Sequence, residues 1–195
     1  MFIRRAIGWF LLKLVGWKAI GGMPKEGRYV MIAAPHTTNW DMPYMIAISW
    51  RLNVKIHWIG KKSLFRFPYG WFMKMLGGIA VDRSKRQNTV QQISQWMLSR
   101  PNCIVVVPPE GTRGSTPFWK SGFYHIAREA KVPITMGFLD YANKCGGFGP
   151  TIQPTGDTKT DMEHFRAFYQ PSMAKYSQKY TVPRLKEEVE EGTEG

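Results

Sequence analysis

Apolar and polar residues follow two kinds of pattern along this chain. Apolar residues at helical spacing predict helices over residues 42–50, 88–99, 123–130 and 161–179. Residues 146–154 are expected to form a loop or an edge strand. Short apolar runs typical of buried strands lie at 29–34, 54–59, 79–81, 103–107 and 132–139. Because strands and helices alternate, we expect one α/β domain over residues 21–183, with a largely parallel sheet flanked by helices.

The first 20 residues predict an amphipathic helix that ends before two glycines. Arg4 and Arg5 lie opposite its apolar face, which consists of Ile3, Ala6, Ile7, Phe10, Leu14 and Trp17. Aromatic residues flanked by bases on such a helix are typical of a membrane interface. We therefore expect residues 1–20 to form a membrane-interface helix. The alternative is a helix packed on the core of its own domain.

Residues 64–76 are unusually rich in large apolar side chains for a stretch that also holds Arg66, Pro68 and Gly70. These side chains are Leu64, Phe65, Phe67, Trp71, Phe72, Met73, Met75 and Leu76. The segment is either part of the core or a surface for an acyl chain and a membrane. Core is the expected position for most of them, since large apolar residues are usually buried.

The chain carries a formal net charge of +13 over 195 residues. Five of the 14 acidic residues fall within residues 184–195, which we expect to be a disordered acidic tail, so the body is still more basic. A basic body favours anionic partners, namely nucleic acid, anionic lipid or an acidic carrier protein, and charge alone does not choose among them. Cys103 and Cys145 indicate a reducing compartment or no redox role, and neither has a neighbour at a zinc-binding spacing.

The stretch Pro35-His36-Thr37-Thr38-Asn39-Trp40-Asp41 predicts a strand, a short turn and a helix start. Five residues is the wrong separation for two side chains on one helical face, so His36 and Asp41 meet only if the chain folds back. A carboxylate beside an imidazole fixes its tautomer and stabilises its protonated form, which is the makeup of a general base. The alternative is an exposed loop histidine and an aspartate that only caps the helix.

Further polar residues follow other predicted strands, and in a parallel sheet the carboxyl ends of the strands meet at one edge. Lys61, Arg83 and the segment Glu110-Gly111-Thr112-Arg113 are placed in this way, beside His36. Arginine forks match phosphate geometry, so a base beside several cations suits a hydroxyl on a phosphorylated substrate. The alternative is a solvated basic surface in which Glu110 pairs with Arg113 or Lys61. Because no Gly-x-Ser-x-Gly elbow is present, we favour direct attack by the substrate hydroxyl over an acyl-enzyme.

Four blocks of this sequence resemble the glycerolipid acyltransferases, specifically the lysophosphatidic acid acyltransferase group. Together they cover roughly residues 28–140 in the family's order: the His-x4-Asp stretch 36–41, residues 60–83 with Gly60-Lys61 and Val81-Asp82-Arg83, Pro109-Glu110-Gly111-Thr112-Arg113, and Val132-Pro133-Ile134. The resemblance implies acyl transfer from acyl-CoA or acyl carrier protein to a hydroxyl of a lysophospholipid such as 1-acylglycerol 3-phosphate, with no bound cofactor or metal. It implies His36 as the base and Asp41 as its partner. Lys61, Arg83, Glu110, Gly111, Thr112 and Arg113 would hold the acceptor phosphate or the donor.

Two departures leave the acceptor and the depth of membrane insertion open: Gly114 stands where many members have serine, and the amino-terminal region is shorter than the family's helical anchor. A transacylase, or an enzyme acting on an ornithine lipid or a glycolipid, is therefore an alternative. A non-catalytic basic module for membrane or nucleic acid is another, although the order of the four blocks argues against nucleic acid. We expect a peripheral or monotopic protein at the cytoplasmic face of a membrane; the sequence carries no signal for oligomeric state.

Overall fold

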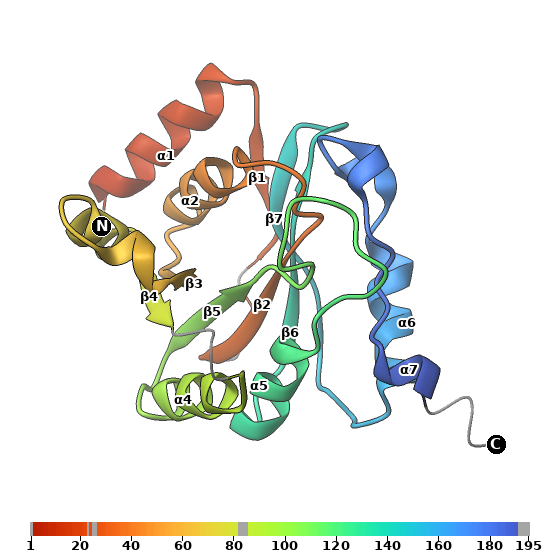
Figure 1. Cartoon of the computed structure of the whole chain (residues 1–195). Coiled ribbons are helices and arrows are strands. Elements are labelled where there is room, and N and C mark those ends of the chain that lie inside the picture. The colour runs from red at the N-terminus through yellow and green to blue at the C-terminus, as the bar shows by residue number, and fades with distance from the viewer. Residues whose placement is uncertain (1, 23, 25–26, 82–85, 191–195) are drawn as a thin grey trace.

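Seven strands form one sheet through the centre of the molecule, in the order β1-β7-β6-β2-β5-β3-β4 (Figure 1). A computed structural model describes residues 2–22, 24, 27–81 and 86–190, without the side chains of residues 86–88 and 190. The strands are β1 Lys18–Ile20, β2 Arg28–Ala34, β3 Ile56–Lys61, β4 Gly78–Val81, β5 Cys103–Val107, β6 Ile134–Asp140 and β7 Cys145–Ile152. Every neighbouring pair is parallel except β6 and β7, which confirms the predicted largely parallel sheet.

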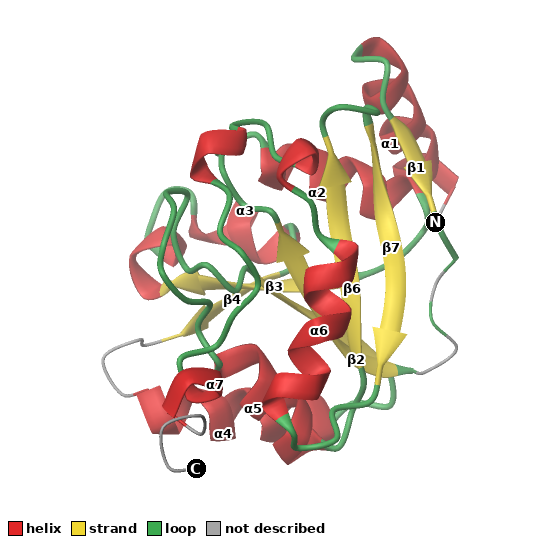
Figure 2. Cartoon of the chain, turned by 90° about the vertical axis from the view of Figure 1, so that its right-hand side faces the viewer, coloured by secondary structure: helices red, strands yellow, loops and turns green. Residues whose placement is uncertain are grey.

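Helices cover both faces of the sheet (Figures 1 and 2). α4, α5 and α6 lie on one face; α2, with η1 and α3, lies on the other, and α1 packs on the outside of α2. Their bounds are α1 Phe2–Leu14, α2 Asp41–Arg51, η1 Lys62–Phe65, α3 Gly70–Met75, α4 Arg86–Leu98, α5 Gly122–Ala130, α6 Thr158–Phe168, η2 Pro171–Met173, η3 Ser177–Lys179 and α7 Glu187–Glu190. The helix predicted over 161–179 ends at Phe168, because the residue before Pro171 must be extended.

The core has a layer on each side of β2. Val30 and Ile32 pack in the cluster beneath α4, α5 and α6, whereas Tyr29 and Met31 pack in the cluster on the α2 side. Since successive side chains of a strand point to opposite faces, a strand covered on both faces must be apolar throughout. That requirement explains the continuous apolar runs in the sequence.

The amino-terminal helix is shorter than predicted. It ends at Leu14, Gly16 turns with a φ of +72°, and Lys18–Ile20 form the edge strand β1 instead of a continuing helix. Glycine adopts this left-handed conformation without steric cost, whereas a helix cannot continue through it. The prediction of one helix over residues 1–20 is therefore wrong beyond Leu14.

The face of α1 predicted to be apolar points outward over most of its length. Ile3, Phe10 and Leu14 are exposed, while Leu12 and Gly8 are buried against α2. A Cβ atom at Gly8 would lie 2.6 Å from the main-chain oxygen of Ala47, so the two helices approach too closely for any larger residue. The narrow Gly8–Leu12 side thus packs on the domain, and the broad apolar side does not.

Most large side chains of residues 64–76 are also exposed, which contradicts the expectation that they are core. Phe67 is 96% exposed and Trp71 69%. Of the group, Phe65 and Met73 pack against the core cluster on the α2 side. Leu64, Tyr69, Phe72 and Met75 are exposed as well.

The carboxyl-terminal segment is ordered further than predicted. The main-chain oxygen of Arg184 accepts a hydrogen bond of 2.7 Å from the Trp119 N–H, and Leu185 is fully buried. Glu188 in α7 pairs with Arg166 at 2.7 Å. The expectation of a disordered tail from residue 184 is therefore wrong up to residue 190, and residues 191–195 lie outside the described chain.

Candidate active site

The candidate site lies where the parallel strands β6, β2, β5 and β3 reach their carboxyl ends. His36 comes two residues after β2, Glu110 three residues after β5, and Lys61 is the last residue of β3. Tyr141 directly follows β6. Since these strands are neighbours in the sheet, the segments that follow them lie along one edge, as the sequence predicted.

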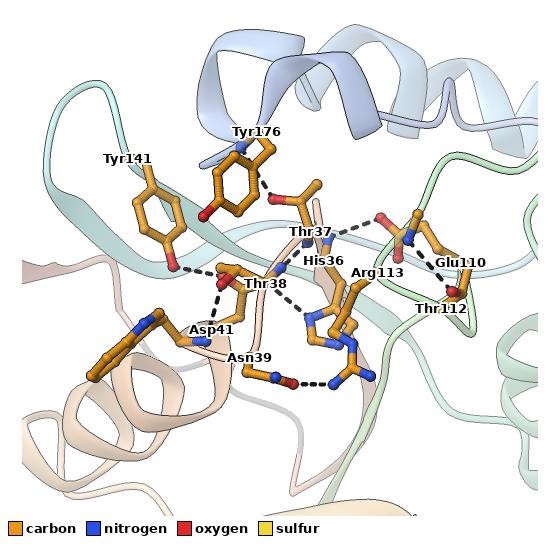
Figure 3. A network of polar contacts seen from close by, with 12 residues as sticks. His36, Thr37, Thr38, Asn39, Asp41, Glu110, Thr112, Arg113, Tyr141 and Tyr176 are labelled. Carbon is orange, nitrogen blue, oxygen red and sulfur yellow. Dashed lines mark hydrogen bonds and ion pairs between the residues drawn. The ribbon is translucent and has the colours of Figure 1, made fainter.

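The Asp41 carboxylate is the centre of a hydrogen-bond network (Figure 3). Its Oδ2 lies 2.9 Å from His36 Nδ1 and accepts the main-chain N–H groups of Thr37 at 3.0 Å and Thr38 at 3.1 Å. Its Oδ1 accepts the Tyr141 hydroxyl at 2.6 Å. The chain therefore folds back between His36 and Asp41, which confirms the predicted meeting of the two side chains across a strand-to-helix turn.

Asp41 does not act as a helix cap. Trp40 occupies the cap position, and Asp41 is the first residue of α2. Its partners Thr37 and Thr38 precede the helix, so the carboxylate organises the turn that carries His36. The interpretation of Asp41 as a plain N-cap is wrong.

This arrangement fixes the tautomer of His36. An acceptor at Nδ1 places the ring proton there, which leaves Nε2 as the nitrogen with a free lone pair. The His36 side chain is 24% exposed, whereas that of Asp41 is 8% exposed. An imidazole that is reachable by solvent and backed by a buried carboxylate can accept a proton from a ligand.

Glu110 supports the His36 turn from within the protein. Its Oε1 accepts the main-chain N–H of His36 at 3.0 Å, and its Oε2 has no hydrogen-bond partner among the described residues. Burial raises the pKa of Glu110 to about 7, because a charged carboxylate loses its hydration there; the His36 N–H acts in the opposite direction. The pairing of Glu110 with Arg113 or Lys61, considered from the sequence, is replaced by this contact with His36.

Two of the predicted cations are exposed at this edge. The Arg113 guanidinium donates a hydrogen bond to the Asn39 side-chain oxygen, which joins the loop after β5 to the His36 turn. Lys61 is exposed at the end of β3. Arg83 lies outside the described residues.

Gly111 and Thr112 shape the loop that carries Arg113. Gly111 has a φ of +66°, a left-handed conformation that favours glycine, and its N–H donates to the Pro108 oxygen at 3.2 Å. Thr112 is exposed, and its Oγ1 accepts the N–H of Gly114 at 3.4 Å. The loop therefore turns sharply between Glu110, which points into the protein, and Arg113, which points out of it.

Sequence reasoning missed two tyrosines at this edge, Tyr141 and Tyr176. Tyr141 comes two residues after the predicted strand 132–139, so the rule that selected the other residues could have found it. Tyr176 lies between η2 and η3, and its N–H donates to the Thr37 hydroxyl at 3.4 Å. No local pattern links Tyr176 to a turn 139 positions earlier in the chain. In the described chain, no group of three or more His, Cys, Asp or Glu residues could hold a metal ion.

Comparisons with known proteins point to one family. A family model described as Acyltransferase matches residues 21–136. A 1-acyl-sn-glycerol-3-phosphate acyltransferase from Saccharomyces cerevisiae is 33% identical over 132 residues, which are 63% of this chain and 41% of the relative. A protein of the same description from Haemophilus influenzae is 33% identical over 139 residues, which are 65% of this chain and 56% of the relative.

A solved structure has the same fold. The crystal structure of the 1-acyl-sn-glycerophosphate (LPA) acyltransferase PlsC from Thermotoga maritima aligns with a TM-score of 0.56 at 16% sequence identity, over 86% of this chain and 80% of that chain. At this identity the likeness shows the fold alone. The chain spans about half the length of the two curated relatives.

Proposed function

Because this chain belongs to the acyltransferase family, we propose that it transfers a fatty acyl group from an acyl thioester to the hydroxyl of a lysophospholipid. The resemblance carried by the four sequence blocks is confirmed by the family match and the curated relatives. The donor is acyl-CoA or acyl carrier protein, and 1-acylglycerol 3-phosphate is the first acceptor to consider. The observation that carries the proposal is the His36–Asp41 pair, 2.9 Å apart at the exposed edge of the sheet.

In this reaction His36 acts as the general base. Nε2 takes the proton of the acceptor hydroxyl as its oxygen attacks the thioester carbonyl carbon. The carbon–sulfur bond then breaks, and His36 returns the proton to the leaving thiolate. Asp41 stabilises the imidazolium that exists between the two proton transfers. No covalent acyl-enzyme forms, because the acceptor oxygen attacks the donor directly.

Cations at the same edge hold the anionic parts of the substrates. Arg113 is exposed and joined to the His36 turn through Asn39, so a phosphate bound there lies close to the base. Lys61 supplies further positive charge from the end of β3, and Arg83, which lies outside the described residues, is assigned the same role from the resemblance to the family. Gly111 and Gly114 let the main chain approach the ligand, and Thr112 belongs to the same binding loop. Glu110 supports the site by fixing the His36 main chain.

Membrane docking follows from two exposed apolar surfaces. One is the outer face of α1; the other is the segment 62–76. Both lie on the side of the sheet opposite α6 (Figure 1). Exposed bases accompany them, namely Arg4, Arg5, Lys62, Arg66 and Lys74. Apolar side chains interleaved with bases suit the headgroup region of an anionic bilayer.

Every helix in the described chain is too short or too polar to cross a membrane. From the two exposed apolar surfaces and the bases beside them, we propose peripheral or monotopic docking at a cytoplasmic membrane face.

Product formation tests the proposed function. Purified protein is incubated with vesicles that contain 1-oleoylglycerol 3-phosphate and with palmitoyl-CoA or palmitoyl–acyl carrier protein. Mass spectrometry should detect phosphatidic acid with at least one donor. Parallel reactions with an ornithine-lipid or glycolipid acceptor, or with phospholipid as the sole acyl source, test the alternative acceptors and the transacylase. If no acylated lipid forms in any of these mixtures, the protein does not have the proposed activity.

Substitutions on the outer face of α1 should weaken membrane binding. Deleting residues 1–18 is unsuitable, because it removes the buried Leu12 and Trp17. Replacing Ile3, Phe10 and Leu14 with glutamine should instead lower the affinity for anionic vesicles at least about tenfold, since each buried CH2 group contributes about 0.8 kcal/mol. Vesicle co-sedimentation measures the effect.

A matched control substitutes exposed apolar residues elsewhere. Leu98 is 50% exposed at the end of α4, and Val182 is 57% exposed near the carboxyl terminus. Replacing both with glutamine should leave vesicle affinity unchanged. Equal loss of affinity in the two variants would show that α1 has no special part in docking.

A further inference from the structure

We infer that Tyr141 is a positioning residue that holds the Asp41 carboxylate in line with His36. The inference rests on the proposed function, because it assigns Tyr141 a role in setting up the proposed base. Tyr141 lies outside the segment matched by the family model, which ends at residue 136.

The two oxygens of Asp41 have separate partners (Figure 3). Oδ2 serves the turn, through His36, Thr37 and Thr38, whereas the hydrogen bond at Oδ1 comes from the Tyr141 hydroxyl at 2.6 Å. A carboxylate bound through only one oxygen can rotate about its own axis and weaken all three contacts at once. The short charge-assisted bond at Oδ1 opposes this rotation.

Tyr141 itself is held from three directions. Its main-chain N–H donates to the Met173 oxygen in η2 at 3.0 Å. Its ring meets that of Trp17 edge-on, with centroids 4.9 Å apart, and that of Tyr44 at 5.8 Å. Trp17 stacks on Tyr44 at 4.2 Å and is buried. The hydroxyl is thus presented to Asp41 by an aromatic cluster built from the segment after α1 and from α2.

The Tyr141 hydroxyl remains a hydrogen-bond donor throughout the working pH range. Burial raises the pKa of Tyr141 well above its usual value, and the hydrogen bond to Asp41 raises it further. The titratable and charged groups that face this network from the surrounding segments are His36, Asp41, Tyr44, Glu110, Tyr176 and Lys175, whose ammonium lies 6.0 Å from the Tyr141 ring. Tyr141 therefore acts as a fixed dipole beside groups that can change their charge.

Removing this hydroxyl shifts the charge on the Asp41 carboxylate in a definite direction. The Tyr141 bond draws negative charge toward Oδ1; without it, more charge remains on Oδ2, beside His36. The imidazolium form of the proposed base is then paired with a more negative oxygen and is stabilised more strongly, which moves the acid limb of kcat/KM toward higher pH.

The test compares Tyr141→Phe with Tyr124→Phe. Tyr124 also donates a 2.6 Å hydrogen bond to a buried aspartate, Asp161, but in the core beneath α5 and α6. With 1-oleoylglycerol 3-phosphate and the acyl donor that supports turnover, Tyr141→Phe should lower kcat about tenfold, with KM within about twofold. Its acid limb should move up by about half a pH unit. Tyr124→Phe should change thermal stability only.

A second variant keeps the test decisive if Tyr141→Phe does not fold. 3-Fluorotyrosine at position 141 preserves the ring and donates a stronger hydrogen bond, so the acid limb should move to lower pH. If the acid limb stays in place in both the fluorinated protein and Tyr141→Phe, the inference is wrong. If the unmodified protein forms no acylated lipid with any donor and acceptor, the proposed function itself fails, whereas an acid limb that stays in place in an active enzyme overturns only the role of Tyr141.

Discussion

Replacing His36 with alanine is expected to lower kcat by about 10²- to 10⁴-fold, the usual contribution of a positioned general base. The variant loses the Nε2 atom proposed to take the acceptor proton, whereas Asp41 retains its bonds from Thr37, Thr38 and Tyr141. Because these contacts survive and the His36 side chain is partly exposed, the free energy of unfolding should change little. Turnover is measured by mass spectrometry of the acylated lipid, and stability by denaturant unfolding.

The matched control is His164→Ala on α6, which removes an exposed histidine that does not follow any of the strands that form the site. It should retain full turnover, and both variants should bind anionic vesicles as the unmodified protein does. Near-normal turnover in His36→Ala would rule out the general-base mechanism. Loss of turnover together with loss of folding would be visible in the unfolding curve.

Local sequence patterns were sufficient for the centre of the fold. The strand β2, the turn with Pro35 and the helix α2 follow from apolar continuity, proline geometry and helical spacing. The same reasoning required His36 and Asp41 to meet across a turn. The predicted strand ends then placed Lys61, Glu110 and Arg113 together, because the carboxyl ends of parallel strands all lie on the same side of the sheet.

The contacts that the sequence did not predict depend on distant segments. Apolar periodicity showed that α1 has a broad apolar face, but not that the narrow Gly8–Leu12 side is the one packed on α2. For residues 64–76, the composition does not indicate which side chains face the core, because only the neighbouring helix and strands decide which side chains are covered. Tyr176 reaches the His36 turn through tertiary packing, which no local sequence pattern predicts. The place of Tyr141 after a predicted strand indicates the site, but not its hydrogen bond to Asp41.

The Glu110→Gln variant should become more stable relative to the unmodified protein as pH rises. In the unfolded chain Glu110 ionises near its ordinary pKa of 4.5, whereas burial raises that pKa to about 7 in the folded protein. The folded state therefore binds the proton more tightly. The stability that Glu110 contributes is fully present below about pH 4.5 and is lost as pH rises through about 7. A shift of this size corresponds to about 3 kcal/mol.

Glutamine removes this titration but retains the contact that fixes the turn, because its side-chain oxygen can still accept the His36 N–H. Urea unfolding of both proteins at a series of pH values measures the effect. The difference in the free energy of unfolding should move in favour of the variant by about 3 kcal/mol between roughly pH 4 and pH 8. Glu129→Gln, at an exposed position of α5, should show no such trend. Parallel stability curves for Glu110→Gln and the unmodified protein would mean that Glu110 titrates alike in both states, and that its burial beneath His36 carries no electrostatic cost.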